Sequence, residues 1–297
     1  MRVGIFERTS ADKYKASEKL FVDTLRELGW VEGTNIVFDR VFANDELSRL
    51  PALAAALVNR SPNLIYAIGS ADAAVAATRT IPIVLGSQSD FVERGWAKSL
   101  AHPGGNLTGT TSFQAEFAAK RIELLKEVAP RIKRIAFLAS STMPASFASV
   151  QKKAVDAAAN SLKVELREFV VREPAEIPEA FNAMTKSRVE AVLINEEPML
   201  NSNASVIAGL AAVKKLPAVG FASFADAGGL LAYGANRPAV YGRVAYFVDR
   251  ILKGAKPGDI PFERPTKFDR VINLKTAKTL GIKIPNSILV QATRVIE

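Results

Sequence analysis

The chain has 297 residues, of which 48% are hydrophobic and 23% charged, a balance typical of a folded globular protein rather than a disordered one. Its length allows one or two domains of ordinary size, and no apolar run approaches the roughly 18 residues that a membrane-spanning helix needs. The formal net charge of +9 is compatible with binding to nucleic acid, and the pattern of basic residues decides whether such a partner is expected.

The densest basic run covers residues 120–134, and its pattern indicates a helix surface. The basic residues, Arg121 among them, alternate with Ile122, Leu125 and Val128, as on the solvated face of an amphipathic helix. Acidic residues interrupt the run, and neither interleaved aromatic residues nor a known nucleic-acid motif accompanies it. We therefore expect no nucleic-acid partner.

Several kinds of reactive residue are missing. The chain has no cysteine, which excludes disulfides, thiolate nucleophiles and cysteine metal sites. The single histidine, His102, precedes a Pro-Gly-Gly turn, where we expect it to be solvated. The Rossmann, Walker A, HExxH, GxSxG and SxxK motifs are absent. The sequence thus predicts no metal, no cofactor and no enzyme, although a lysine or carboxylate mechanism would leave no motif.

The first part of the chain alternates between strand and helix patterns. Strands are predicted at residues 2–6, 35–41, 64–68 and 81–85, and helices at residues 15–28, 50–60 and 71–78. The first helix places on one face Leu20, Phe21, Leu25 and Leu28. This alternation predicts parallel strands covered by helices on both faces.

A Gly- and Thr-rich stretch, residues 103–113, separates this series from a second one, and we interpret it as a crossing segment between two similar lobes. The second series predicts helices at residues 115–128, 144–162, 177–186 and 204–215, and strands at residues 134–139, 164–171, 191–194 and 218–221.

The tail predicts two further crossings. Residues 229–234 form a second crossing strand, and a helix at 240–252 follows. After a Pro- and Gly-rich connector, extended structure resumes at residue 268 and a short closing unit ends the chain. The predicted fold class is α/β, with two doubly wound parallel-sheet lobes joined by a three-stranded hinge. The N-terminal lobe comprises residues 1–109 and 235–266, and the C-terminal lobe residues 110–234 and 267–297.

Ligands of open α/β sheets bind at the carboxyl ends of the strands, next to helix N-termini. Polar loops with small residues, such as residues 7–10, follow the predicted strands at these positions. The candidate ligand-binding residues of the first lobe are Thr9, Ser10, Ser70, Ala71, Ser87, Gln88 and Asp90. Those of the second lobe are Ser141, Thr142, Asn195, Glu196, Phe221, Ser223 and Asp226.

These residues have two interpretations. In the functional one, Ser70 with the Ala71 N–H binds an anion, acidic side chains meet an ammonium group, and aromatic rings wall an apolar group. The acidic candidates are Glu196, Glu197 and Asp226, and the aromatic ones are Phe221 and Phe224. In the structural one, the serines cap helices, the phenylalanines belong to the core and the glutamates are solvated.

Seven segments, in order along the chain, carry a family resemblance: residues 25–33, 81–84, 103–109, 120–127, 227–234, 248–257 and 272–278. Together they resemble the ABC-transporter substrate-binding proteins of the tryptophan/tyrosine-binding type, from near residue 20 to the end. The chain departs from the better-known members after Phe221, where Ala222-Ser223 stands in place of Ser-Asp. The acidic partner for a ligand ammonium group is therefore open.

The resemblance implies a type I periplasmic-binding-protein fold with two lobes and three crossovers that close on a small ligand. It also implies export to the periplasm, with the leader absent from this chain, and a membrane permease as partner for a monomeric receptor. Family members with known ligands bind amino acids, notably aromatic ones. We expect the solute-binding component of an ABC importer with an amino-acid ligand in the interlobe cleft.

Alternatives remain. A receptor for a small organic or aromatic carboxylate would use the same fold, and so would the ligand-sensing domain of a regulator. The regulator would need a DNA-binding or signalling domain, for which we expect no room in this chain. A cleft enzyme of the doubly wound class is the third alternative.

Overall fold

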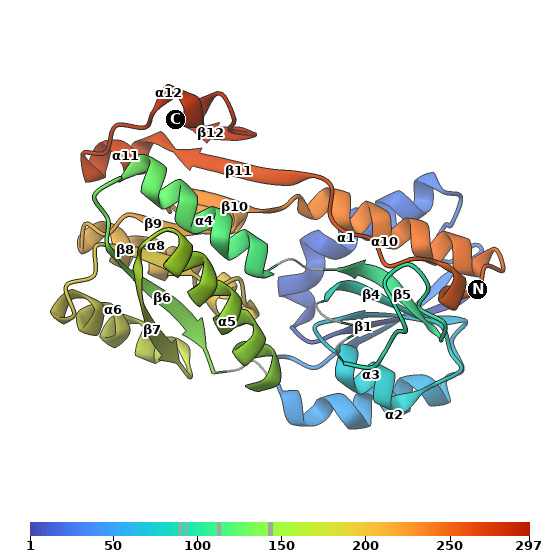
Figure 1. The fold of residues 1–297 in the computed structure, drawn as a ribbon. Coiled ribbons are helices and arrows are strands. Elements are labelled where there is room, and N and C mark those ends of the chain that lie inside the picture. Colours follow the sequence, from blue (N-terminus) through green and yellow to red (C-terminus); the bar gives the residue numbers. More distant parts are fainter. Residues whose placement is uncertain (89–90, 93, 112–113, 142–144) are drawn as a thin grey trace. The chain divides into compact units, whose positions relative to one another are not determined.

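The computed structural model describes residues 1–88, 91–92, 94–111, 114–141 and 145–297 (Figure 1). The chain forms two compact units: unit 1 contains residues 1–112 and 235–267, and unit 2 contains residues 113–234 and 268–297. The chain therefore passes from one unit to the other three times, and neither unit is continuous in sequence.

Unit 1 is an open parallel sheet with helices on both faces. Its strands are β1 (Arg2–Glu7), β2 (Val37–Phe42), β3 (Leu64–Ile68), β4 (Ile83–Gln88) and β5 (Leu107–Thr111). Its helices are α1 (Ala11–Glu27), α2 (Leu50–Asn59), α3 (Ala71–Ala77) and α10 (Arg237–Leu252), with short 3₁₀ turns at Leu47–Arg49 and Pro257–Asp259. The strand order is β2-β1-β3-β4-β5, and all of these neighbours pair in parallel.

Alternate residues of the unit 1 strands face opposite sides, and each side has its own core. On one face, Val3 and Ile5 of β1 pack with α1 and α10. On the other, Phe6 packs with α2 and α3. The inward face of α1 carries Phe21 and Leu25, as predicted. The prediction that Leu20 also faces inward was wrong, because Leu20 is 37% exposed. Tyr14 and Ser17 complete that face instead.

Residues 103–113 had been interpreted as a crossing segment, and β5 within them is the edge strand of the unit 1 sheet. The Thr108 hydroxyl donates to the Ile260 carbonyl at 2.9 Å. This bond connects β5 to residues 235–267, the later part of the chain in unit 1. Gly109 lies so close to β4 that a Cβ atom there would sit 2.1 Å from the Leu85 carbonyl oxygen, and its φ is +150°. Only glycine satisfies both conditions.

Unit 2 contains a larger sheet. Its strands are β6 (Arg134–Ser140), β7 (Glu165–Val171), β8 (Ala191–Ile194), β9 (Ala218–Gly220), β10 (Leu231–Ala235), β11 (Phe268–Asn273) and β12 (Arg294–Ile296), in the order β12-β11-β10-β9-β8-β6-β7. Parallel pairing joins β6 to β7 and β8, β8 to β9, β9 to β10, and β11 to β12.

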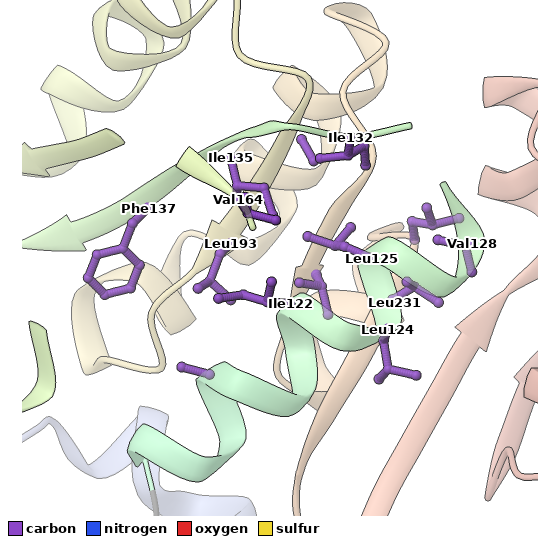
Figure 2. Packing of buried hydrophobic residues seen from close by; sticks show 14 of the residues in the cluster. Ile122, Leu124, Leu125, Val128, Ile132, Ile135, Phe137, Val164, Leu193 and Leu231 are labelled. Atoms are coloured by element: carbon purple, nitrogen blue, oxygen red, sulfur yellow. The ribbon is translucent and has the colours of Figure 1, made fainter. Parts of the chain in front are cut away.

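The helices of unit 2 cover both faces of this sheet. They are α4 (Gln114–Val128), α5 (Ala145–Ser161), α6 (Ile177–Lys186), α7 (Pro198–Ser202), α8 (Ala204–Val213), α9 (Ala222–Asp226), α11 (Leu274–Leu280) and α12 (Asn286–Leu289), with a 3₁₀ turn at Pro174–Glu176. Figure 2 shows the core on the α4 side, where Ile122 and Leu125 meet Ile135 of β6 and Leu193 of β8. The predicted inward face of α4 is thus confirmed.

Replacing Gly109 with alanine should destabilise unit 1, because the new Cβ would collide with backbone atoms of β4 that cannot yield independently. We expect the free energy of unfolding to fall by about 3 kcal/mol or more. Urea unfolding followed by circular dichroism measures this change.

The matched control is Gly105→Ala, in the same stretch, where an added Cβ meets nothing within 4 Å. Its midpoint should stay near that of the wild type. Equal midpoints for the two variants would contradict the close approach of β5 and β4.

Candidate functional site

Each sheet contains one point at which the strand order reverses, and ligands of such sheets bind outside the strand ends there. In unit 1 the reversal lies between β1 and β3, whose carboxyl ends lead into residues 8–10 and 69–71. In unit 2 it lies between β6 and β8, which lead into Ser141 and residues 195–197. The predicted candidates Thr9, Ser10, Ser70 and Ala71 therefore gather at one switch point.

The strand ends of unit 1 are locked together by their own hydrogen bonds. The buried Ser70 hydroxyl donates to the Phe6 carbonyl at 2.6 Å, and the Arg8 N–H donates to the Ile68 carbonyl at 3.0 Å. Ser70 precedes α3 without a side-chain capping bond, so the capping interpretation was wrong. Its hydroxyl proton is already used, and only its oxygen lone pairs remain for another group.

Glu7 ends β1 and is only 4% exposed. Its Oε1 accepts hydrogen bonds from the Thr9 N–H at 2.9 Å and the Thr9 hydroxyl at 3.0 Å. The carboxylate therefore fixes the first turn of the loop that carries the candidates Thr9 and Ser10.

Burial raises the pKa of Glu7 from 4.5 to about 7, against the opposing effects of the Thr9 hydrogen bonds and the Arg237 charge. Because the folded-state pKa lies above the ordinary one, the contribution of Glu7 to stability is fully present below about pH 4.5. It is lost as the pH rises through about 7.

Aromatic and basic side chains surround Glu7. Arg237 of α10 donates to the Ser17 hydroxyl at 3.1 Å and to the Tyr241 hydroxyl at 3.0 Å. The hydroxyls of Tyr14 and Tyr66 are buried without a hydrogen-bond partner of normal geometry within the described part of the chain. Burial raises the pKa of both tyrosines, so they stay neutral.

At the switch point of unit 2, Glu197 is 2% exposed, so the interpretation of this residue as solvated was wrong. Its Oε1 accepts the Ser140 N–H at 2.9 Å and the Asn195 amide at 2.7 Å, and its Oε2 accepts the Ser140 hydroxyl. Asn195, also buried, accepts the Glu196 N–H with its side-chain oxygen at 3.1 Å. These bonds hold the loop after β8 in one conformation.

Arg121 was predicted on the solvated face of α4, and this was wrong: the residue is 1% exposed. Its Nε donates to the Tyr233 carbonyl at 2.7 Å, and its Nη2 forms an ion pair with Glu196 at 2.7 Å. The backbone of Gly234 passes beside both charged groups, since an added Cβ would lie 3.3 Å from Arg121 and 3.4 Å from Glu196. Through both contacts Arg121 joins α4 to the loop after β8 and to β10.

The remaining candidates of unit 2 are distributed between core and surface. Phe221 is 2% exposed and packs in the core with Phe224, which favours the core interpretation of both rings. Ser223 is exposed and donates to Asn201 at 2.5 Å, and Asp226 pairs with Arg294 at 2.5 Å.

Some predicted residues are described only in part. Ser141 is exposed, and its N–H donates to the Val171 carbonyl at 3.0 Å. The backbone of Ser87 and Gln88 belongs to β4, but their side chains, together with Asp90 and Thr142, lie outside the described residues.

Sequence reasoning missed Glu7, Arg121 and the tyrosines around Glu7 as parts of the strand-end regions. The signal for Glu7 was an acidic residue that closes a buried apolar strand, within the polar loop already noted. In the described ranges, no group of three or more His, Cys, Asp or Glu side chains could hold a metal ion. None of the helices traced in those ranges has the length and apolarity to cross a membrane.

Replacing Arg121 with alanine should lower the free energy of unfolding by about 2–4 kcal/mol, because it leaves Glu196 and the Tyr233 carbonyl without their partner. Thermal and urea unfolding measure the loss. The neighbouring Lys120→Ala removes a half-exposed ion pair with Glu123 and should change stability by less than about 1 kcal/mol. Equal effects of the two substitutions would show that the buried pair does not stabilise unit 2.

Several known proteins are similar to this chain in sequence and in structure. A "Tyrosine-binding protein" of Clostridioides difficile is 27% identical over 282 residues, which cover 94% of this chain and 79% of the relative. An ABC domain from Streptococcus pneumonia, solved in complex with L-Trp, has a TM-score of 0.89 at 26% identity over 99% of both chains. A conserved domain protein from Vibrio cholerae has a TM-score of 0.90, also at 26% identity over 99% of both chains.

These similarities confirm the predicted fold class, two lobes of parallel sheet in the type I periplasmic-binding-protein arrangement. The sequence model of one family, ABC transporter substrate binding protein, matches residues 2–296. That match spans both units, so the chain belongs to the family of ABC transporter substrate-binding proteins.

Proposed function

We propose that this chain is the extracytoplasmic solute-binding component of an ABC importer and that its ligand is an aromatic amino acid. The observation that carries the ligand class is the agreement of two independent likenesses. The curated relative is named for tyrosine, and a solved structure of the same length holds L-Trp.

The chemistry of the strand ends supports a zwitterionic ligand. At the switch point of unit 1, Thr9, Ser10 and Ser70 bring small polar groups beside the buried Glu7. At that of unit 2, buried Asn195 and partly exposed Glu196 follow β8. Amide and hydroxyl groups suit a carboxylate, and an acidic side chain suits an ammonium group. We assign ligand contacts to these loops together with Ala71 and Ser141.

Release of the ligand to a membrane permease completes the proposed role. A ligand shifts a receptor toward one conformational state only to the extent that it binds that state more tightly than the other. The tighter-binding state therefore signals that the receptor is occupied. The family to which the chain belongs acts by binding, and we propose no chemical change of the ligand.

The proposed function predicts saturable binding of L-Tyr, L-Trp or L-Phe with one site per chain. Isothermal titration calorimetry at pH 8 measures it, and the melting temperature should rise with ligand concentration. Removal of the amino group, as in 3-(4-hydroxyphenyl)propionate, should weaken binding at least about tenfold, because a buried polar partner is left unmatched.

The outcomes separate the ligand classes. Tighter binding of benzoate or the deaminated acid than of any amino acid would replace the proposed ligand with an aromatic carboxylate. Chemical turnover of a bound compound, detected by chromatography, would show that the chain is an enzyme rather than a receptor. Alanine and glutamate serve as negative controls for the aromatic side chain.

The importer role makes a separate prediction about cells. Uptake of the radiolabelled ligand at concentrations near its dissociation constant should fall when the gene for this chain is deleted and return when the gene is supplied. Unchanged uptake, together with tight binding in vitro, would indicate a sensing role rather than transport.

A further inference from the structure

The acidic side chains near the strand ends differ in whether they already have partners. Asp226 pairs with Arg294, and Glu196 pairs with the buried Arg121. Glu197 accepts three hydrogen bonds, shared between both of its oxygens. Each of these carboxylates would have to give up or share a partner to bind a cationic group.

Glu7 is in a different situation. Both of its hydrogen bonds, from the N–H and the hydroxyl of Thr9, go to Oε1. Its Oε2 receives no hydrogen bond from the residues that the structure describes, although the whole residue is only 4% exposed. Unlike the Tyr14 and Tyr66 hydroxyls, Oε2 is not fully buried, so it is an unfilled acceptor that a ligand can reach.

The carboxylate also lies in the right place. It bonds the N–H of the residue two positions further on, so it extends past the end of β1 rather than along the sheet. The end of β1 is one side of the unit 1 switch point, and Ser70, bonded to the Phe6 carbonyl, marks the other. Ligands of doubly wound sheets bind at this kind of position.

We propose that Glu7 is the specificity residue that binds the ammonium group of the ligand through Oε2. This inference rests on the proposed function, since it requires an amino-acid ligand. It assigns to unit 1, and not to the acidic residues of the loops after β8 and β9, the recognition of the amino group. Thr9 then acts through Glu7, as a positioning residue that orients the carboxylate.

The groups that face Glu7 decide how binding depends on pH. Tyr14 of α1 and Tyr66 of β3 approach it, and both remain neutral because burial raises their pKa. Arg237 of α10 attracts the carboxylate and Asp45, after β2, repels it. Asp45 itself pairs with Arg8 at 3.9 Å and Lys13 at 2.7 Å.

Of these groups, Glu7 changes charge near neutral pH, because burial raises its pKa to about 7. Only the ionised form can pair with an ammonium group. One pH unit below that pKa about a tenth of the protein is ionised, and the apparent affinity should fall about tenfold. Binding at pH 7 should release a fraction of a proton.

The experiment measures the affinity of the wild type and of Glu7→Gln for the tightest-binding aromatic amino acid and for its deaminated analogue, between pH 5.5 and 8.0. We expect the wild type to bind the amino acid about tenfold more weakly at pH 6 than at pH 8. Glu7→Gln should bind it at least about tenfold more weakly than the wild type at pH 8, without this pH dependence. The deaminated analogue should bind the two proteins alike.

Two controls keep folding and net charge apart from recognition. Asp23→Asn removes one negative charge from the other end of α1, where Asp23 pairs with Lys19 and Arg26, and it should leave all affinities unchanged. Glu7→Gln removes a buried charge, so its melting temperature at pH 8 should not fall below that of the wild type. Proton release on binding, measured by calorimetry of the wild type in buffers of different ionisation enthalpy, requires no variant.

The outcomes distinguish this inference from the proposed function. If the wild type binds no aromatic amino acid, the proposed function fails and Glu7 has no ammonium group to bind. If the wild type binds an amino acid and Glu7→Gln binds it equally well, the function stands and the assignment of Glu7 is overturned. Equal weakening of the amino acid and the deaminated analogue would also overturn it, since it would indicate a merely structural role.

Discussion

A charge removed from water has to be met by hydrogen bonds or by an opposite charge, and this constraint shapes both strand-end regions. Glu7 and Glu197 lie almost wholly inside their units, at or just after the end of a central strand. Their donors are neighbouring groups of the chain itself: Thr9 for the first, Ser140 and Asn195 for the second. Each carboxylate thereby fixes the loop that leaves its strand. The polar groups offered at the switch points keep one arrangement before any ligand arrives, which is the condition for selective binding.

The two carboxylates nevertheless differ in how many of their oxygens accept hydrogen bonds. Both oxygens of Glu197 accept hydrogen bonds, and this residue stabilises its loop. At Glu7 the hydrogen bonds reach one oxygen, and burial holds the pKa at about 7. The ionised form therefore costs stability near neutral pH, a cost that a cationic ligand would offset. Such local conflict between stability and charge is typical of binding sites rather than of structural ion pairs.

The sequence predicted the fold well where the signal is local. The predictions of β3 at the apolar run Leu64–Ile68 and of α3 after Ser70 were confirmed. In both places the spacing of apolar residues and the flanking turn residues indicate the same element. The five-residue helices α7 and α9 escaped prediction because so short a segment contains no measurable period. Arg121 was misplaced because its burial depends on Glu196 and Tyr233, which lie 75 and 112 residues further along the chain. The partners of Glu7 and Ser70 likewise follow from sheet geometry, which sequence patterns do not specify.

The three passages of the chain between the units bear on how the protein folds. The core of unit 1 includes Val244, Phe247 and Val248 of α10, which follow almost the whole of unit 2 in sequence. During synthesis, the unit that begins first can therefore bury its α1 face only after residue 252 has emerged from the ribosome. Unit 2 in turn waits for β11 and β12, at the very end. Residues 237–297 thus close both cores, and a chain released before residue 237 leaves two open apolar surfaces rather than one finished domain.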